Sequence, residues 1–181
     1  MQIWDSHERY GAISRPLHWG MAALMVWQFG GVLAKKALGE ENGLAAALSG
    51  NHTEVGTMLA VLIVLRLIWA FANRHNRPPH DEGLRGQLAK AGHLALYALM
   101  VLVPAAALLR AWGGKWGYSP FGIEVFPGRE PEQVVGFATW IGGTFHGELG
   151  LIMGALILGH ILMAVIHARQ SRGRTVGRMA G

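Results

Sequence analysis

Four long apolar stretches run through the chain, and polar or aromatic connections separate them. An α-helix needs about 20 predominantly apolar residues to cross about 30 Å of hydrocarbon, and each stretch reaches or approaches that length. The pattern therefore predicts an all-α, integral membrane four-helix bundle. The expected helices cover about residues 16–35, 52–72, 91–111 and 146–168.

Composition agrees with a single membrane domain over residues 1–181. Hydrophobic residues make up 51% of the chain and charged residues 15%, against about 25% charged residues in soluble domains. Residues 1–15 are polar and precede the first span, so they do not resemble a cleaved secretory signal. We expect the first span to act as a signal-anchor.

Basic residues are distributed unequally between the two sides of this bundle. The N-terminal segment, the second connection and the C-terminal tail carry ten of them: Arg9, Arg15, Arg74, Arg77, Arg85, Lys90, Arg169, Arg172, Arg174 and Arg178. The first and third connections carry five: Lys35, Lys36, Arg110, Lys115 and Arg129. The positive-inside rule then places both termini in the cytoplasm. The net charge of +5 reflects this topology and contact with anionic lipid rather than nucleic acid.

The chain contains no cysteine. This excludes disulfides, iron–sulfur clusters, thiolate-ligated haem and covalent haem attachment at a C-x-x-C-H motif. Nine histidines remain as candidate metal ligands.

Two of these histidines, His146 and His160, share the last apolar stretch. Fourteen residues correspond to about 21 Å along a helix axis and return to within about 40° of the same face. Polar side chains at membrane depth are costly and usually functional. The spacing favours two metal centres, one near each membrane surface.

Depth in the membrane pairs the remaining candidates. His52 opens the second span at the level of His146, and His18 opens the first span at the level of His160. Each pair is suited to hold one haem iron through two neutral imidazoles. Each histidine alone has another interpretation, as a polar residue near the end of a span, but the four matched in depth favour two haems that carry electrons across the bilayer.

Other polar residues lie near the same depths. Arg66 comes fourteen residues after His52, and its charge would be compensated either by a haem propionate or by snorkelling to the headgroups. His93 and His167 either compete as ligands or are polar groups near the inner haem. Gly30 and Gly31 would let a macrocycle or a neighbouring helix approach.

The third connection, 111–144, is long and rich in aromatic residues. Long connections in compact proteins are often functional, so this one would cap the outer haem or dock a partner. Aromatic residues beside a span also form ordinary interfacial belts, and that interpretation stays open.

An ordered set of short strings resembles the bacterial cytochrome b561 family over nearly the whole chain. The set comprises Leu17-His18-Trp19, His52 with Arg66-Leu67, Gly92-His93-Leu94 followed by Tyr97 and Pro104, and the spacing of His146, His160 and His167. The resemblance implies a multi-pass protein of the bacterial inner membrane that holds two haem b groups. Ligands in the wider family come from the first, second and fourth helices, which correspond here to His18, His52, His146 and His160.

The resemblance also implies a function. Members pass electrons between the quinone pool and a partner or small oxidant, and some resemble superoxide oxidases that reduce ubiquinone. Where the family often has Glu-Thr-Trp-Ala-Asn after the first ligand of the fourth helix, this chain has Gly147-Glu148-Leu149-Gly150-Leu151. The resemblance therefore does not carry over one specific activity.

Two hypotheses follow. In the first, the chain transfers electrons between a quinone and an outer donor or acceptor, such as superoxide attracted by Lys35, Lys36 and Lys115. No catalytic residue is assigned, and the candidates for a proton-exchanging quinone site are His93, His167, Ser14 and Arg15. In the second, the chain is a membrane-anchor cytochrome b subunit that relays electrons for a soluble dehydrogenase or cytochrome.

Overall fold

The computed structural model describes residues 2–79, 83–170 and 174–180, and these residues form helices without any named strand. The elements are α1 (Ser14–Leu38), α2 (Gly43–Ser49), α3 (His52–Ala72), α4 (Gly83–Gly113), the 3-10 turns η1 (Pro120–Gly122) and η2 (Pro131–Gln133), α5 (Gly136–Gln170) and α6 (Arg174–Ala180). Arg172, which the basic tail includes, lies outside the described residues. Four helical segments, α1, α2 with α3, α4 and α5, are long and apolar enough to cross a membrane, which confirms the expected fold class.

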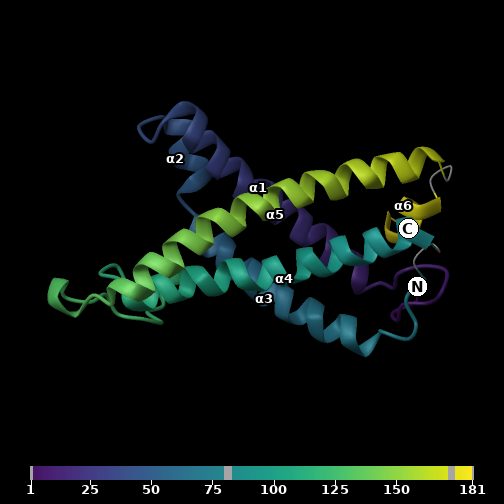
Figure 1. Ribbon diagram of the computed structural model, residues 1–181, viewed down its shortest axis with the longest axis horizontal. Coiled ribbons are helices and arrows are strands. Elements are labelled where there is room, and N and C mark those ends of the chain that lie inside the picture. The colour runs from purple at the N-terminus through teal and green to yellow at the C-terminus, as the bar shows by residue number, and fades with distance from the viewer. Residues whose placement is uncertain (1, 80–82, 171–173, 181) are drawn as a thin grey trace.

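The long helices run back and forth between two ends of the molecule, and both termini lie at the same end (Figure 1). We call this the terminal end; it carries residues 2–13, residues 73–79 and α6. We call the opposite end the loop end; it carries α2 and residues 114–135 (Figure 1).

Two helix starts differ from the sequence prediction. The fourth long helix begins at Gly136 rather than near residue 146, and the third begins at Gly83 rather than near residue 91. Hydropathy locates the part of a helix that is apolar enough for lipid, and these helices continue beyond that part. A Cβ on Gly142 would lie 2.6 Å from the carbonyl oxygen of Ala106, so the backbones of α4 and α5 approach closely in the extended region.

The short helix α2 was not predicted. The side chain of Asn42 caps it by accepting hydrogen bonds from the backbone N–H groups of Leu44 and Ala45. A Cβ on Gly31 would lie 2.5 Å from the carbonyl oxygen of Leu48, so this glycine admits the backbone of α2. A Cβ on Gly30 would meet nothing within 4 Å. Helix packing, one of the two roles considered for this glycine pair, therefore accounts for Gly31.

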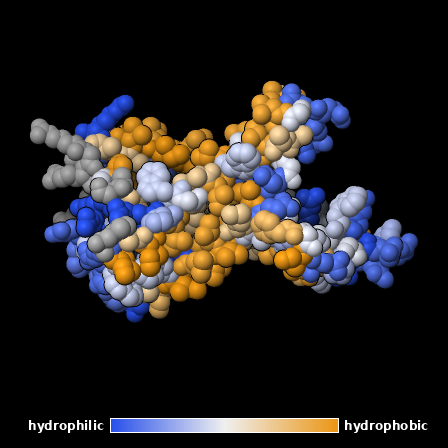
Figure 2. All heavy atoms as spheres, turned by 180° about the vertical axis from the view of Figure 1, so that it is seen from behind, coloured by the Kyte–Doolittle hydropathy of each residue, from blue (hydrophilic) through white to orange (hydrophobic). Residues whose placement is uncertain are grey.

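Two small apolar cores hold the helices together. Met21 of α1 packs on Val55, Leu59 and Ile63 of α3, and Leu99 and Val103 of α4 pack on Met153 of α5. Most other apolar side chains face outward. On the face seen in Figure 2, hydrophobic residues cover the middle of the molecule and hydrophilic residues gather at both ends. This is the surface that a membrane-spanning bundle presents to lipid.

Candidate functional site

The first histidine pair lies in the loop-end half of the bundle. His52 opens α3, and its ring centre lies 6.0 Å from that of His146 on α5, with the ring planes at 86°. The Nδ1 atom of His146 lies 3.0 Å from the carbonyl oxygen of Val103 on α4. Because a carbonyl accepts, Nδ1 carries the proton and Nε2 keeps its lone pair for a metal.

Polar side chains from other segments contact α3 at and near His52. The side-chain amide of Gln28 on α1 donates to the carbonyl oxygen of His52 at 2.9 Å. One turn further along α3, the hydroxyl of Thr57 bonds that of Tyr118, which belongs to the third connection. The connection therefore folds against α3 close to His52. Tyr118 meets α3 at Thr57, five residues beyond His52, so a cap over this pair stays a prediction.

The second pair lies in the terminal-end half. The ring centres of His18 on α1 and His160 on α5 are 6.2 Å apart, with the planes at 71°. Arg66 of α3 contacts this pair: its Nε donates to the hydroxyl of Tyr97 at 3.1 Å, and a terminal nitrogen lies 3.3 Å from Nδ1 of His18. Arg66 therefore bonds within the bundle rather than reaching out to the headgroups.

The Arg66 contact sets the tautomer of His18. A guanidinium has donors only, so Nδ1 of His18 accepts here and its proton is on Nε2. A metal bound through Nε2 would need this proton on Nδ1 instead, and Arg66 would then have to turn to another acceptor. A haem propionate is an acceptor of the right charge for it.

The spacing within each pair fits two axial ligands of one metal. Two imidazoles that bind the same metal through bonds of about 2 Å have ring centres about 6 Å apart. The observed separations are 6.0 and 6.2 Å. Among the residues that the structure describes, no three histidine or acidic side chains could together hold a bare metal ion. The donor set therefore fits a metal with a macrocycle and two free axial positions, as in haem.

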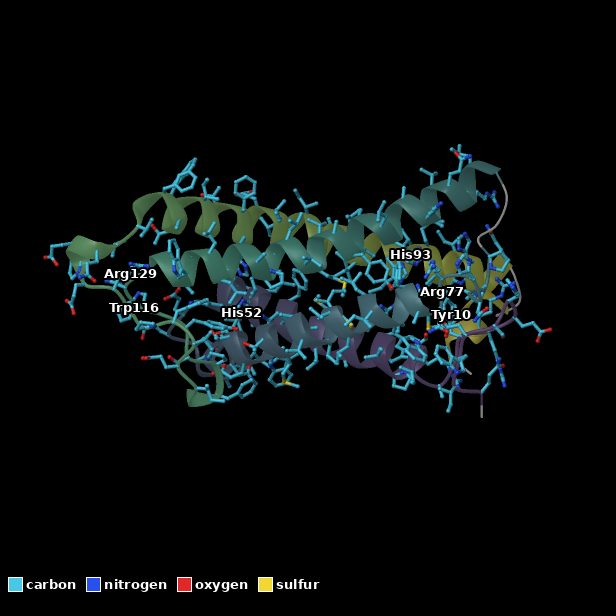
Figure 3. The ribbon with its side chains drawn as sticks, turned by 90° about the horizontal axis from the view of Figure 1, so that it is seen from below. Tyr10, His52, Arg77, His93, Trp116 and Arg129 are labelled. Atoms are coloured by element: carbon cyan, nitrogen blue, oxygen red, sulfur yellow. The ribbon has the colours of Figure 1, made fainter. Side chains whose placement is uncertain are left out.

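Four further candidates lie toward the terminal end, and Figure 3 shows His93 in that half of the molecule. The ring centre of His93 is 5.2 Å from that of His160. His167 is half-buried, two turns after His160 on α5. The Nε of Arg15 is buried and makes no hydrogen bond to any described residue. The hydroxyl of Ser14 is engaged, because it donates to Asp5 at 2.6 Å and accepts from Trp69 at 2.9 Å.

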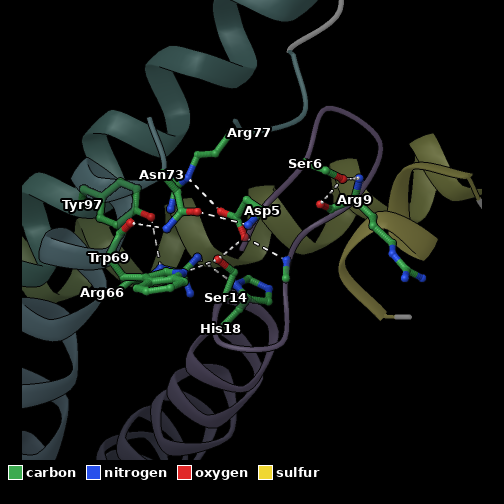
Figure 4. A network of polar contacts seen from close by, with 11 residues as sticks. Asp5, Ser6, Arg9, Ser14, His18, Arg66, Trp69, Asn73, Arg77 and Tyr97 are labelled. Carbon is green, nitrogen blue, oxygen red and sulfur yellow. Dashed lines mark hydrogen bonds and ion pairs between the residues drawn. The ribbon is translucent and has the colours of Figure 1, made fainter. Parts of the chain in front are cut away.

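A buried polar network closes the terminal end (Figure 4). Asp5 is 2% exposed, and its Oδ1 accepts from Ser14 and from the backbone N–H of Gly11 at 2.8 Å. Its own N–H donates to the side chain of Asn73 at 3.1 Å. The Nε of Arg77 lies 3.4 Å from Oδ2 of Asp5, close enough for an ion pair but not aligned as a hydrogen bond. The network joins the N-terminal segment to α1 and α3.

Aromatic residues also connect the N-terminal segment and α1 to α3 and α6. The rings of Trp4 and Trp69 stack with centres 5.0 Å apart. The backbone N–H of Tyr10 and the indole of Trp19 donate to carbonyl oxygens of α6, those of Arg178 and Met179. Burial raises the pKa of the Tyr10 phenol, and the charge of Arg77 partly opposes this shift. Tyr10 therefore stays neutral at physiological pH.

The sequence did not predict this network, nor the contact between the carbonyl of Val103 and His146. Asp5 gave a weak signal, as one of two acids ahead of the first span and the one next to a tryptophan. The carbonyl of Val103 gave none, because backbone acceptors are present at every position and only packing selects one of them.

Comparisons with known proteins show the family to which the chain belongs. Residues 9–181 match the family described as prokaryotic cytochrome b561. A search of curated proteins finds similarity to cytochrome b561 homolog 2 of Escherichia coli (strain K12), with 27% identity over all of this chain and 96% of that protein.

Proposed function

Because the chain belongs to the prokaryotic cytochrome b561 family, a family of haem b electron-transfer proteins of the membrane, we propose that it holds two haem b groups and conducts electrons through the bilayer. One end of this path exchanges electrons with the quinone pool. The other end exchanges them with a donor or acceptor on the far side of the bacterial inner membrane.

The observation that carries the proposal is the repeated spacing of the two histidine pairs. His52 with His146, and His18 with His160, each present two imidazoles at the separation that axial ligation needs. The fourteen residues between His146 and His160 separate the pairs by about 21 Å along α5. Helices α1 and α3 each supply one ligand, and α5 supplies two.

The residues around the pairs suit electron transfer rather than oxygen binding. Each histidine pair would hold its haem through two imidazoles, and a haem held in this way would supply reversible one-electron chemistry. Val103 orients the ring of His146 through its carbonyl. In the terminal-end half, Arg66 and the buried Nε of Arg15 offer positive charge that would bind propionates.

The terminal end suits a quinone site. Quinone reduction consumes protons, and His93 and His167 are titratable groups close to the His18–His160 pair. The positive-inside rule places this end in the cytoplasm. Arg15 contributes charge at the same level, whereas the hydroxyl of Ser14 is already engaged by Asp5 and Trp69, so its part in a quinone site stays a prediction.

A second candidate function is favoured by the charge of the loop end. Residues 35–54 and 110–148, which comprise the loop end and the adjoining parts of the long helices, carry five basic residues but seven glutamates: Glu40, Glu41, Glu54, Glu124, Glu130, Glu132 and Glu148. Lys35 is also paired with Glu40 at 3.0 Å. A net negative surface repels superoxide and attracts a basic soluble redox protein. This favours a membrane-anchor cytochrome that relays electrons for such a partner over a superoxide:quinone oxidoreductase.

The effect of ionic strength on the rate of haem reduction tests whether superoxide is attracted to the loop end. If superoxide is steered to the loop end by lysines, added salt will slow haem reduction by superoxide. The net acidic surface predicts instead that salt leaves this rate unchanged or raises it. Stopped-flow reduction of the purified protein at low and high salt measures the sign.

The test of the main proposal is a dithionite-reduced minus oxidised spectrum of the purified chain, calibrated for haem b per polypeptide. We expect two low-spin haems in the wild type and one in each alanine variant of His52 and His146. His75→Ala is the matched control, because His75 is exposed outside the spans, and it should keep both haems. One haem or none in a folded wild-type sample would contradict the proposal.

A further inference from the structure

His93 of α4 lies closer to His160 than the proposed partner ligand does. The ring centres of His93 and His160 are 5.2 Å apart at an interplanar angle of 78°, whereas those of His18 and His160 are 6.2 Å apart. His160 thus has two imidazole neighbours at different separations.

The two separations indicate two kinds of contact. A metal between two imidazoles sets their ring centres about 6 Å apart, from bonds of about 2 Å. A direct hydrogen bond between ring nitrogens about 3 Å apart sets the centres about 5 Å apart. The His18–His160 separation matches the first arrangement, and the His93–His160 separation matches the second.

The tautomer of His93 leaves it able to accept a hydrogen bond. Its Nδ1 lies 2.7 Å from the carbonyl oxygen of Ala89, one turn earlier on α4. Since the carbonyl accepts, Nδ1 of His93 carries the proton in the neutral ring. Its Nε2 is then an acceptor at the far edge of the ring.

We propose that His93 is a positioning residue for the haem ligand His160, whose Nδ1–H donates to Nε2 of His93. This inference rests on the proposed function, because it treats His160 as an axial ligand through Nε2. An acceptor on the outer nitrogen of a ligating histidine fixes its tautomer and orientation and makes it a stronger donor to the metal.

The proposal gives α4 the same role at both ends of the bundle. At the loop end, the carbonyl of Val103 on α4 accepts from Nδ1 of His146. At the terminal end, His93 on α4 would accept from Nδ1 of His160. Helix α4 supplies no ligand, but it would orient both ligands that come from α5.

The experiment compares His93→Leu with His93→Gln in the haem-loaded protein. Leucine keeps bulk and removes the acceptor, whereas glutamine offers an amide oxygen near the position of Nε2. We expect both variants to keep two haems. In His93→Leu, the midpoint potential of the terminal-end haem should shift upward and its low-spin EPR signal should change, with the loop-end haem unaltered. His93→Gln should restore most of both properties.

Three results would overturn the inference. Loss of the terminal-end haem in His93→Leu, together with its retention in His18→Ala, would make His93 a ligand. An unchanged potential and EPR signal in His93→Leu would show that His160 does not depend on a hydrogen bond to His93. Slow quinol oxidation with an unchanged potential would assign His93 to the quinone site instead. If His93→Leu does not fold, a His93→Gln protein whose EPR signal departs widely from the wild type would equally contradict it.

Failure of the underlying function is distinguishable from failure of this inference. A wild-type chain with fewer than two haems would contradict the di-haem proposal before any variant is compared.

Discussion

The two histidine pairs have nearly the same ring separation but different surroundings. The groups that hydrogen-bond His52 and His146 are neutral: the amide of Gln28 and the carbonyl of Val103. Around His18 and His160 a guanidinium, a phenol and a third imidazole are close. If the pairs bind haem as proposed, the loop-end pair would be held mainly by neutral groups, whereas the terminal-end pair would be surrounded by groups that can tune charge and exchange protons.

This difference bears on the direction of electron flow. A unit positive charge about 6 Å from an iron favours the reduced state by about 3 kcal/mol at an effective dielectric constant of about 20. The proposed hydrogen bond from His160 to His93 would favour the oxidised state instead. Because His93 is neutral there, we expect this effect to be smaller than that of the Arg66 charge. We therefore expect the terminal-end haem to have the higher potential, so that electrons run toward the quinone side.

The largest expected effect is loss of one centre at a time. Alanine at His52 or His146 should remove the loop-end haem and leave the other, and alanine at His18 or His160 should do the reverse. Each substitution would remove one of the two imidazoles proposed to hold that haem. Redox titration should show one component in each variant, with one potential shared by the His52 and His146 variants and a different one shared by the His18 and His160 variants. The same remaining potential in all four variants would show that the pairs are assigned wrongly.

The next effect concerns the charge that distinguishes the pairs. Arg66→Gln should lower the midpoint potential of the terminal-end haem by the equivalent of about 1–3 kcal/mol and leave the loop-end haem unchanged. Arg74→Gln is the control, because the side chain of Arg74 is exposed and bonds the carbonyl of Phe71. A spectroelectrochemical titration measures both. Equal shifts in the two haems would contradict a local role.

The terminal end is also closed by a buried network, and we expect its removal to destabilise the protein. Asp5→Ala leaves the Ser14 hydroxyl, the Gly11 N–H and Arg77 without their acceptor. The expected loss is about 1–3 kcal/mol of unfolding free energy. Glu8→Ala changes an exposed carboxylate in the same segment and should have little effect. Thermal unfolding in detergent compares the two; equal midpoints would rule out the network as a stabilising element.

The smallest effect is expected at the neutral pair. Gln28→Leu removes the hydrogen bond to the carbonyl of His52, worth about 0.5–1.5 kcal/mol. It should lower the thermal midpoint slightly while both haems and both potentials are kept. Gln87→Leu, at an exposed position of α4, is the control. A large shift in the loop-end potential would mean that this pair is tuned as strongly as the other.

Much of the site could be predicted because helices convert spacing into position. The interval between His146 and His160 fixes a shared face and a separation along the helix. The starts of the first two spans place His18 at the level of His160 and His52 at the level of His146. The sequence left the direction of the Arg66 side chain open, because a long flexible side chain can point into the bundle or out to the headgroups. Packing against Tyr97 settles its direction.

The sequence by itself determined the class of the fold, the four spans and the level of each histidine, because hydropathy and helical periodicity are local properties. Only the tertiary structure decided which neighbours each ring meets: the carbonyl of Val103, the ring of His93 and the network around Asp5. Those contacts depend on the rotation and approach of helices that are far apart in the chain. Side-chain packing between helices fixes both quantities, and no local pattern encodes them.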